Sequence, residues 1–260
     1  MGQDTLQQLA SLVELVNGLA APGESDAERL EWLTSALRGK RNLVQYLGKL
    51  ILDDSRTRNE HRLAVVLMSV IVRLVVRLNR TPPAESIRSA VLSDLSSIEL
   101  FWSHVVSLVT DLSTGGVGTA VYAVGLLVSA FALNEQLQGE TEWPSRIFAL
   151  STIEAVVVLS RKQDSGSTSL NARIVSSTFE YIVIAHGVHR NRVLQSIGSN
   201  VSHVLEVCCQ MLIAGDRKQD LIGDDLESLS GSGIRALVND LIEQGGDRVY
   251  TPLALMALEM

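Results

Sequence analysis

The chain has 260 residues, of which 46% are apolar, 4% aromatic and 20% charged, and its formal net charge is −7. A chain of this length and apolar content can bury a sizeable core, which excludes an intrinsically disordered protein. The only cysteines are the adjacent pair Cys208 and Cys209, so a disulfide framework is excluded and a reducing compartment, the cytoplasm or nucleus, is expected.

Apolar periodicity predicts helices along the whole chain, and the fold class is therefore all-α. In chain order, the expected helices cover residues 5–19, 25–37, 42–52, 61–79, 85–95, 97–112, 119–137, 144–161, 171–186, 191–197, 199–214, 220–229, 234–243 and 252–260. The runs 63–78 and 117–134 are apolar on most of their circumference. Such helices must be buried on several sides.

Neighbouring helices pair into hairpins that begin near residues 41, 98, 146 and 199. Within residues 189–209, a short helix that ends at Ile197-Gly198 precedes a helix carrying Val201, Val204 and Leu205. This order resembles the armadillo repeat. The resemblance implies one domain, residues 1–260: a right-handed armadillo/HEAT-like helical-repeat array of about four hairpins. Residues 1–40 would form an N-terminal helical cap, 41–243 the hairpins and 244–260 a C-terminal helix.

Basic residues are concentrated in one segment. Residues 38–88 carry eleven basic and four acidic side chains, whereas residues 1–37 carry one basic and six acidic and the remainder carries ten and nineteen. A basic segment in an acidic chain predicts contact with an acidic protein segment or with nucleic acid. Against nucleic acid, the only aromatic residue of the segment is Tyr46.

A stripe of arginines is expected along the helix 61–79. At helical spacing, one narrow face carries Arg62, Val66, Ser69, Arg73, Arg77 and Arg80. Arginines are too costly to bury without partners, so the stripe is either a solvated or salt-bridged ridge or a ridge that binds a partner. The armadillo resemblance places this helix on a concave surface, where Tyr122 and Tyr181 of later hairpins would add contact area.

Two other patterns have simpler interpretations. Residues 117–133 are apolar and barely long enough to cross a membrane, but no flanking basic residues set an orientation, so no membrane contact is expected. The glycine-rich turn 113–120 is similar to a phosphate-binding loop but lacks the lysine and follows a helix, which predicts a turn between helices.

No catalytic motif occurs, and no metal or cofactor is expected. The candidate ligands His186, His189, His203 and Cys208 are spaced for helix ends and opposite helix faces more than for one metal. The sequence therefore predicts a non-enzymatic adaptor that binds an acidic or amphipathic segment of another protein through the arginines and tyrosines above. The alternative is a nucleic-acid-binding module that uses residues 38–88. The helix 252–260 could also form a contact between copies of the chain.

Overall fold

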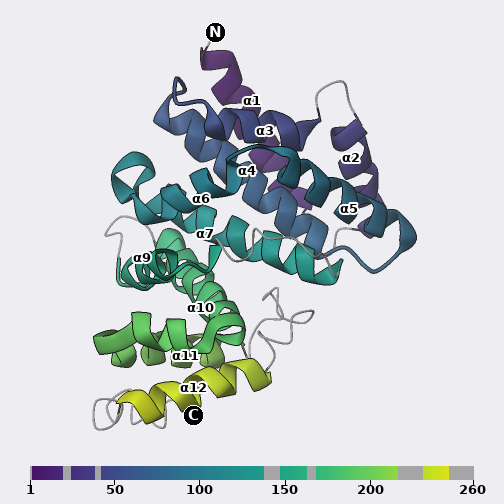
Figure 1. Ribbon diagram of the computed structural model, residues 1–260. Coiled ribbons are helices and arrows are strands. Elements are labelled where there is room, and N and C mark those ends of the chain that lie inside the picture. Colours follow the sequence, from purple (N-terminus) through teal and green to yellow (C-terminus); the bar gives the residue numbers. More distant parts are fainter. Residues whose placement is uncertain are drawn as a thin grey trace. The chain divides into compact units, whose positions relative to one another are not determined.

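The computed structural model describes residues 2–19, 25–38, 42–137, 147–162, 168–215 and 231–245, and within these ranges it contains helices and no strand (Figure 1). The all-α prediction is confirmed. The chain divides into two compact units, residues 1–144 and 145–260, which are described separately. Unit 1 contains α1 Gly2–Leu19, α2 Asp26–Arg38, α3 Leu43–Leu52, α4 Arg58–Val76, α5 Pro82–Ser97, α6 Phe101–Thr110 and α7 Leu112–Gln136.

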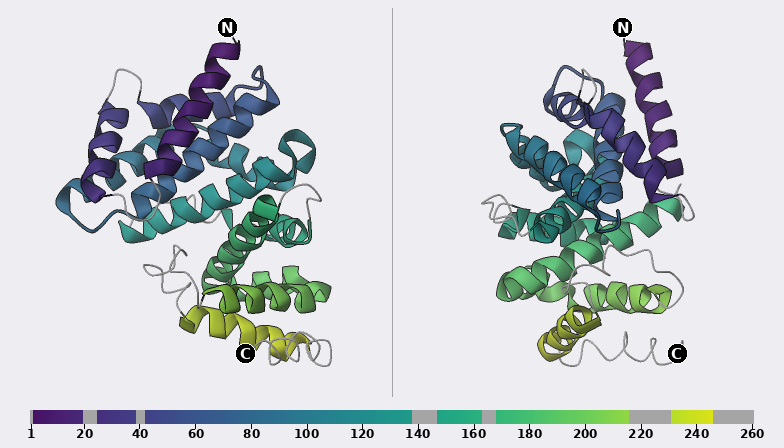
Figure 2. Two further views of the ribbon diagram at one scale, coloured as in Figure 1. Left: turned by 180° about the vertical axis from the view of Figure 1, so that it is seen from behind. Right: turned by 90° about the vertical axis from the view of Figure 1, so that its right-hand side faces the viewer.

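The central helix of unit 1 is α4, and α1, α3, α5 and α7 pack around it (Figures 1 and 2). Its fully buried side chains include Leu67, Met68 and Val72. Their burial removes apolar surface from water on several sides of the helix, which is the main favourable contribution to folding. The apolar run predicted at 63–78 therefore belongs to a core helix.

The helix α7 is interrupted at Gly116, whose φ of 73° lies in the left-handed region that glycine adopts without strain. The second part, Gly116–Gln136, is long and apolar enough to cross a membrane by length and composition alone. However, 78% of its most apolar window is buried inside the structure. This burial is typical of a packed core helix.

The helices α4 and α7 run parallel. At their C-terminal ends, Gln136 Nε2 donates to the Val76 carbonyl oxygen over 3.2 Å. At their N-terminal ends, Gly116 lies against the side chain of Arg58. The positive ends of two helix dipoles therefore lie at the same edge of unit 1, and the negative ends at the opposite edge.

The start of α4 is fixed by a capping box. The Thr57 hydroxyl accepts a hydrogen bond from the Glu60 backbone N–H, and the Glu60 carboxylate accepts from the Thr57 N–H. The helix consequently begins at Arg58, three residues before the start predicted from apolar periodicity. The Thr57-x-x-Glu60 spacing is the sequence signal for this boundary.

Replacing Thr57 by alanine should lower the free energy of unfolding by about 1 kcal/mol, because the Glu60 N–H loses its acceptor. Chemical denaturation of the whole chain measures this loss. The matched control is Thr57→Ser, which keeps the hydroxyl and should unfold near the wild-type denaturant concentration. Equal losses in both variants would show that the threonine methyl, and not the cap, stabilises this end.

Unit 2 contains α9 Leu150–Ser160, α10 Thr168–Ile197, a 3₁₀ turn Gly198–Asn200, α11 Val201–Gly215 and α12 Gly231–Gly245. The two helices predicted at 171–186 and 191–197 are one helix with a kink at His189. Gly198 has a φ of 46° and ends this helix, as expected from the sequence. The helices predicted at 220–229 and 252–260 lie outside the described residues.

Several helices pack against each other within each unit. The packed pairs include α3 with α4, α6 with α7, α9 with α10, and α11 with α12. The N-terminal helix α1 packs on α4 and contributes Leu9 and Val16 to the core of unit 1.

Candidate functional site in a polar pocket of unit 1

The arginine stripe predicted on α4 is interrupted in the structure. The residues in its middle, Val66 and Ser69, are buried. The other members reach solvent at opposite ends of the helix, Arg62 near its start and Arg73, Arg77 and Arg80 near or beyond its end, with Arg73 half-buried. The expected continuous ridge is therefore replaced by two separate basic ends, because neighbouring helices cover the middle of α4.

The two ends of α4 have different electrostatic surroundings. Arg73, Arg77 and Arg80 lie where the carbonyl ends of two parallel helices meet, and cations stabilise such ends. The binding of a partner by these three arginines stays a prediction. Arg62 is exposed at the opposite end and makes no hydrogen bond or ion pair with another described residue.

The two predicted tyrosines lie in different environments. Tyr122 on α7 is half-buried and keeps some accessible surface. Tyr181 on α10 is fully buried in unit 2, where its hydroxyl donates to the Ile147 carbonyl oxygen and its ring lies 5.5 Å from that of Phe148. Burial raises the pKa of Tyr181 well above its ordinary value of 10.0. Tyr181 is thus a core residue and offers no contact surface.

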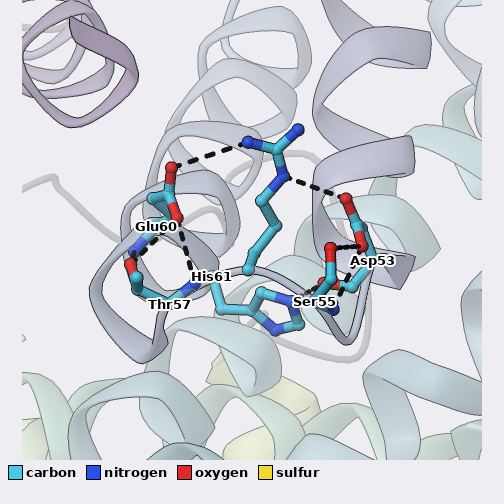
Figure 3. A network of polar contacts seen from close by, with 6 residues as sticks. Asp53, Ser55, Thr57, Glu60 and His61 are labelled. Carbon is cyan, nitrogen blue, oxygen red and sulfur yellow. Dashed lines mark hydrogen bonds and ion pairs between the residues drawn. The ribbon is translucent and has the colours of Figure 1, made fainter. Parts of the chain in front are cut away.

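The loop between α3 and α4 is held by a network of polar contacts (Figure 3). The Asp53 carboxylate accepts hydrogen bonds from the Ser55 hydroxyl and from Arg56 Nε, at 2.5 and 2.9 Å. Arg56 also lies 3.7 Å from the buried carboxylate of Glu60. The Ser55 and Arg56 donors hold the pKa of Asp53 below its usual value, and the backbone donor of the capping box does the same for Glu60.

Beside this loop lies a pocket with a volume of about 300 Å³. It is lined by Asp54, Arg56, Arg58, His61, His104, Ser107, Leu108 and Thr119, which come from the loop and from α4, α6 and α7. The volume is at the lower end of the range for small-molecule sites. Apolar atoms contribute more of its exposed lining than polar atoms do, and the polar groups suit one polar part of a ligand.

Arg58 is the pocket arginine that the loop network leaves available. It forms no hydrogen bond or ion pair with any other described residue, whereas Arg56 is held by Asp53. The guanidinium lies so close to Gly116 that a Cβ at this position would overlap Arg58 Nη2. The positive φ of Gly116 is the reason for glycine at this position, since an exposed arginine side chain can move away from an added Cβ.

Two histidines line the same pocket. His61 Nε2 lies 2.7 Å from the Asp53 carbonyl oxygen, which only accepts, so this nitrogen carries the proton. The rings of His61 and His104 meet edge to face with centroids 6.2 Å apart. Within the described part of the chain, His104 Nε2 is buried and has no hydrogen-bond partner. Burial, followed by the charge of His61, lowers the pKa of His104.

In unit 2, the strongest polar cluster joins α10 to α12. Asp240 is buried and accepts two hydrogen bonds of 2.5 Å from the guanidinium of Arg190. His186 Nε2, also buried, lies 2.8 Å from Asp240 Oδ2. The Arg190 hydrogen bonds are the main reason that the pKa of Asp240 is lowered. This cluster links α10 to α12.

Two further observations concern nucleophilic catalysis and metal binding. Ser160 Oγ lies 3.1 Å from His203 Nε2, but the hydroxyl donates its single proton to the Val157 carbonyl oxygen. An activated serine needs that proton on the histidine side and a third group to orient the base. In the ranges that the structure describes, no three His, Cys, Asp or Glu side chains are placed to hold a metal ion.

Comparisons of the chain with protein-family models, with curated proteins and with solved structures find no match.

Sequence reasoning missed the pocket residues Arg58, His61 and His104. Two local sequence signals lie close to these residues. They are the Thr57-x-x-Glu60 capping box at the start of α4 and the glycine-rich turn that contains Gly116. Neither indicates that the turn lies against α4, because this contact joins segments 58 residues apart in the sequence.

Proposed function

We propose that this protein is a non-enzymatic adaptor that binds an acidic segment of another protein at the N-terminal edge of α4. The observation that carries the proposal is the pair Arg58 and Arg62, one helical turn apart and exposed beside the pocket. Neither side chain is neutralised by an ion pair within the described residues. Two helix N-termini at this edge add further attraction for negative charge.

The proposal includes a repeat arrangement similar to armadillo or HEAT proteins. In a stacked array, corresponding helices of successive hairpins run parallel, since each repeat is related to the next mainly by translation. The parallel packing of α4 and α7, the second helices of two successive hairpins, supports this arrangement within unit 1. The cytoplasmic or nuclear location stays a prediction.

Binding of nucleic acid is less well supported. A phosphate backbone requires a continuous track of cations. Along α4, however, Arg62 and Arg77 are separated by about 22 Å and by a buried middle section. Two other basic residues of segment 38–88 serve internal contacts, since Arg56 binds Asp53 and the buried Arg88 donates to the Leu78 carbonyl oxygen.

Cross-linked affinity capture from native extract tests the proposal. The wild-type protein would be compared with Arg58→Glu/Arg62→Glu and with Arg77→Glu/Arg80→Glu, which makes the same charge change at the opposite end of α4. We expect a protein partner to be captured by wild type and by the Arg77/Arg80 variant, and lost in the Arg58/Arg62 variant. Circular dichroism would establish that both variants keep their helices.

Two results would overturn the proposed surface. Capture that is unchanged in the Arg58/Arg62 variant would remove this edge of α4 from the interface. Capture of nucleic acid alone, with release at moderate salt, would favour the nucleic-acid-binding alternative.

A further inference from the structure

The pocket beside the α3–α4 loop has the features of a site for a small anion, independent of any macromolecular surface. Its volume of about 300 Å³ exceeds the space needed by one ordered water. Its lining carries two guanidiniums, on Arg56 and Arg58, against one carboxylate, on Asp54. Arg56 is already paired with Asp53 and lies near the Glu60 carboxylate, so among the described residues Arg58 is the lining guanidinium whose charge is not offset by a close ion pair.

Arg58 supplies the strongest recognition group. A guanidinium presents paired N–H donors that match two oxygens of a carboxylate or phosphate. The side chain of Arg58 has no acceptor among the described residues, and its guanidinium lies beside Gly116. Its donors are thus placed at the pocket without being consumed by the protein.

Two helix termini favour the same ligand class. The Ser107 hydroxyl gives its single proton to the His104 carbonyl oxygen and supplies no donor to a ligand, and Thr119 lies in the first turn of the Gly116–Gln136 helix. The N-terminus of that helix and the N-terminus of α4 both lie at this edge, which adds to the attraction for an anion. Three ligating carboxylate or imidazole groups for a metal are not found together in the described residues.

We propose that this pocket binds an oxyanion, a phosphate or carboxylate group, with the Arg58 guanidinium as its principal donor. This inference rests on the proposed function for the source of the anion. In the adaptor, an acidic or phosphorylated side chain of the partner would fill the pocket. The binding chemistry itself needs only the pocket.

The charge state of His104 provides a second readout. His104 faces His61 on α4 and Asp54 on the loop, with Arg56 and Arg58 on the same lining. Burial and the charge of His61 lower the pKa of His104, whereas Asp54 raises it. A bound anion will raise this pKa, so binding takes up a proton and becomes tighter as the pH falls through the titration range of His104.

Imidazole NMR signals of His61 and His104 measure binding directly. Inorganic phosphate, acetate and sulfate would each be titrated into the full chain, with sodium chloride at equal ionic strength as the control. We expect saturable shifts with the oxyanions and none with chloride. Sulfate keeps its charge while His104 titrates, so its affinity should rise as the pH is lowered.

Three variants decide which residue is responsible. Arg58→Gln should weaken binding by about 10- to 100-fold, the effect of losing a hydrogen bond to a charged group. Arg58→Lys keeps the positive charge but loses the paired N–H donors of the guanidinium. Its affinity for the oxyanion should therefore lie between those of Arg58→Gln and wild type. Arg62→Gln, one turn further along α4 and outside the lining, should bind like wild type.

A short peptide carrying phosphoserine, with its serine and glutamate counterparts, separates the two sources of the anion. Tighter binding of the phosphopeptide than of the glutamate peptide assigns a phosphate, and the reverse assigns a carboxylate. Absence of saturable shifts with any oxyanion, or equal binding by Arg58→Gln, overturns the pocket site. If the pocket site fails but Arg58→Glu/Arg62→Glu loses the captured partner, the adaptor proposal still stands. If oxyanions bind but this variant captures the same partner, the pocket site stands and the adaptor surface does not.

Discussion

Replacing Tyr181 by alanine should lower the free energy of unfolding of unit 2 by about 3–5 kcal/mol, the range for deleting a large buried aromatic side chain. The ring is fully buried and packs on Phe148, and its hydroxyl satisfies the Ile147 carbonyl oxygen. Removal leaves a cavity and an unpaired acceptor together. Denaturant unfolding, followed by hydrogen exchange in α10, measures the loss.

The control for this variant is Tyr181→Phe, which fills the same space and removes only the hydroxyl. Its expected loss is about 1 kcal/mol, the contribution of one hydrogen bond. A Tyr181→Ala protein of wild-type stability would contradict the core position of this residue. It would also return Tyr181 to the candidate contact surface predicted from the sequence.

Replacing Asp240 by alanine should be the second most damaging change, with a loss of about 2–4 kcal/mol. The buried His186 would lose its hydrogen-bond partner, and Arg190 would lose both of its own. Because Arg190 is 61% exposed, water can solvate its guanidinium after the change, whereas no water reaches His186 as easily. Hydrogen exchange should show α12 opening before the other helices of unit 2.

The variant Arg190→Gln separates the two partners of Asp240. It keeps the His186 contact and removes the more exposed one, so we expect a smaller loss than for Asp240→Ala. A larger loss in Arg190→Gln would mean that the guanidinium, and not the buried imidazole, fixes α12.

The stabilisation from Asp240 should depend on pH in a defined direction. The pKa of this carboxyl is lowered in the folded protein, chiefly by the hydrogen bonds from Arg190, relative to the ordinary value of 3.8. The contribution of Asp240 to the free energy of unfolding is therefore complete above the ordinary pKa of 3.8. It is lost as the pH falls through the lower pKa of the folded protein. The stability difference between wild type and Asp240→Asn should shrink below about pH 4, as measured by unfolding at several pH values. A difference that grows as the pH falls would contradict the ion pair.

The helical class of this protein was predictable because the core helices carry long apolar runs and short polar breaks. Gly198 was also a dependable signal, since a glycine after the last apolar residue commonly ends a helix. The boundary at Arg58 was missed because apolar periodicity begins later than the capping box that starts the helix. Likewise, periodicity alone could not show that the chain continues as one helix, α10, through a kink at His189.

The candidate site was less predictable, because helical spacing places residues on a face without saying what covers that face. Val66 and Ser69 share a face with the arginines of α4, yet neighbouring helices bury them. Tyr122 and Tyr181 look equivalent in the sequence, but only Tyr181 is fully buried. The pocket depends on contacts between distant segments, and these arise from packing that no local pattern encodes.

A photo-cross-linking amino acid at position 62, compared with the same group at position 77, tests most directly whether the N-terminal edge of α4 is the binding surface. In native extract we expect a protein adduct from position 62 that disappears when Arg58→Glu is added, and no such adduct from position 77. An adduct from position 77 alone, or a position-62 adduct that survives Arg58→Glu unchanged, would contradict the proposed surface.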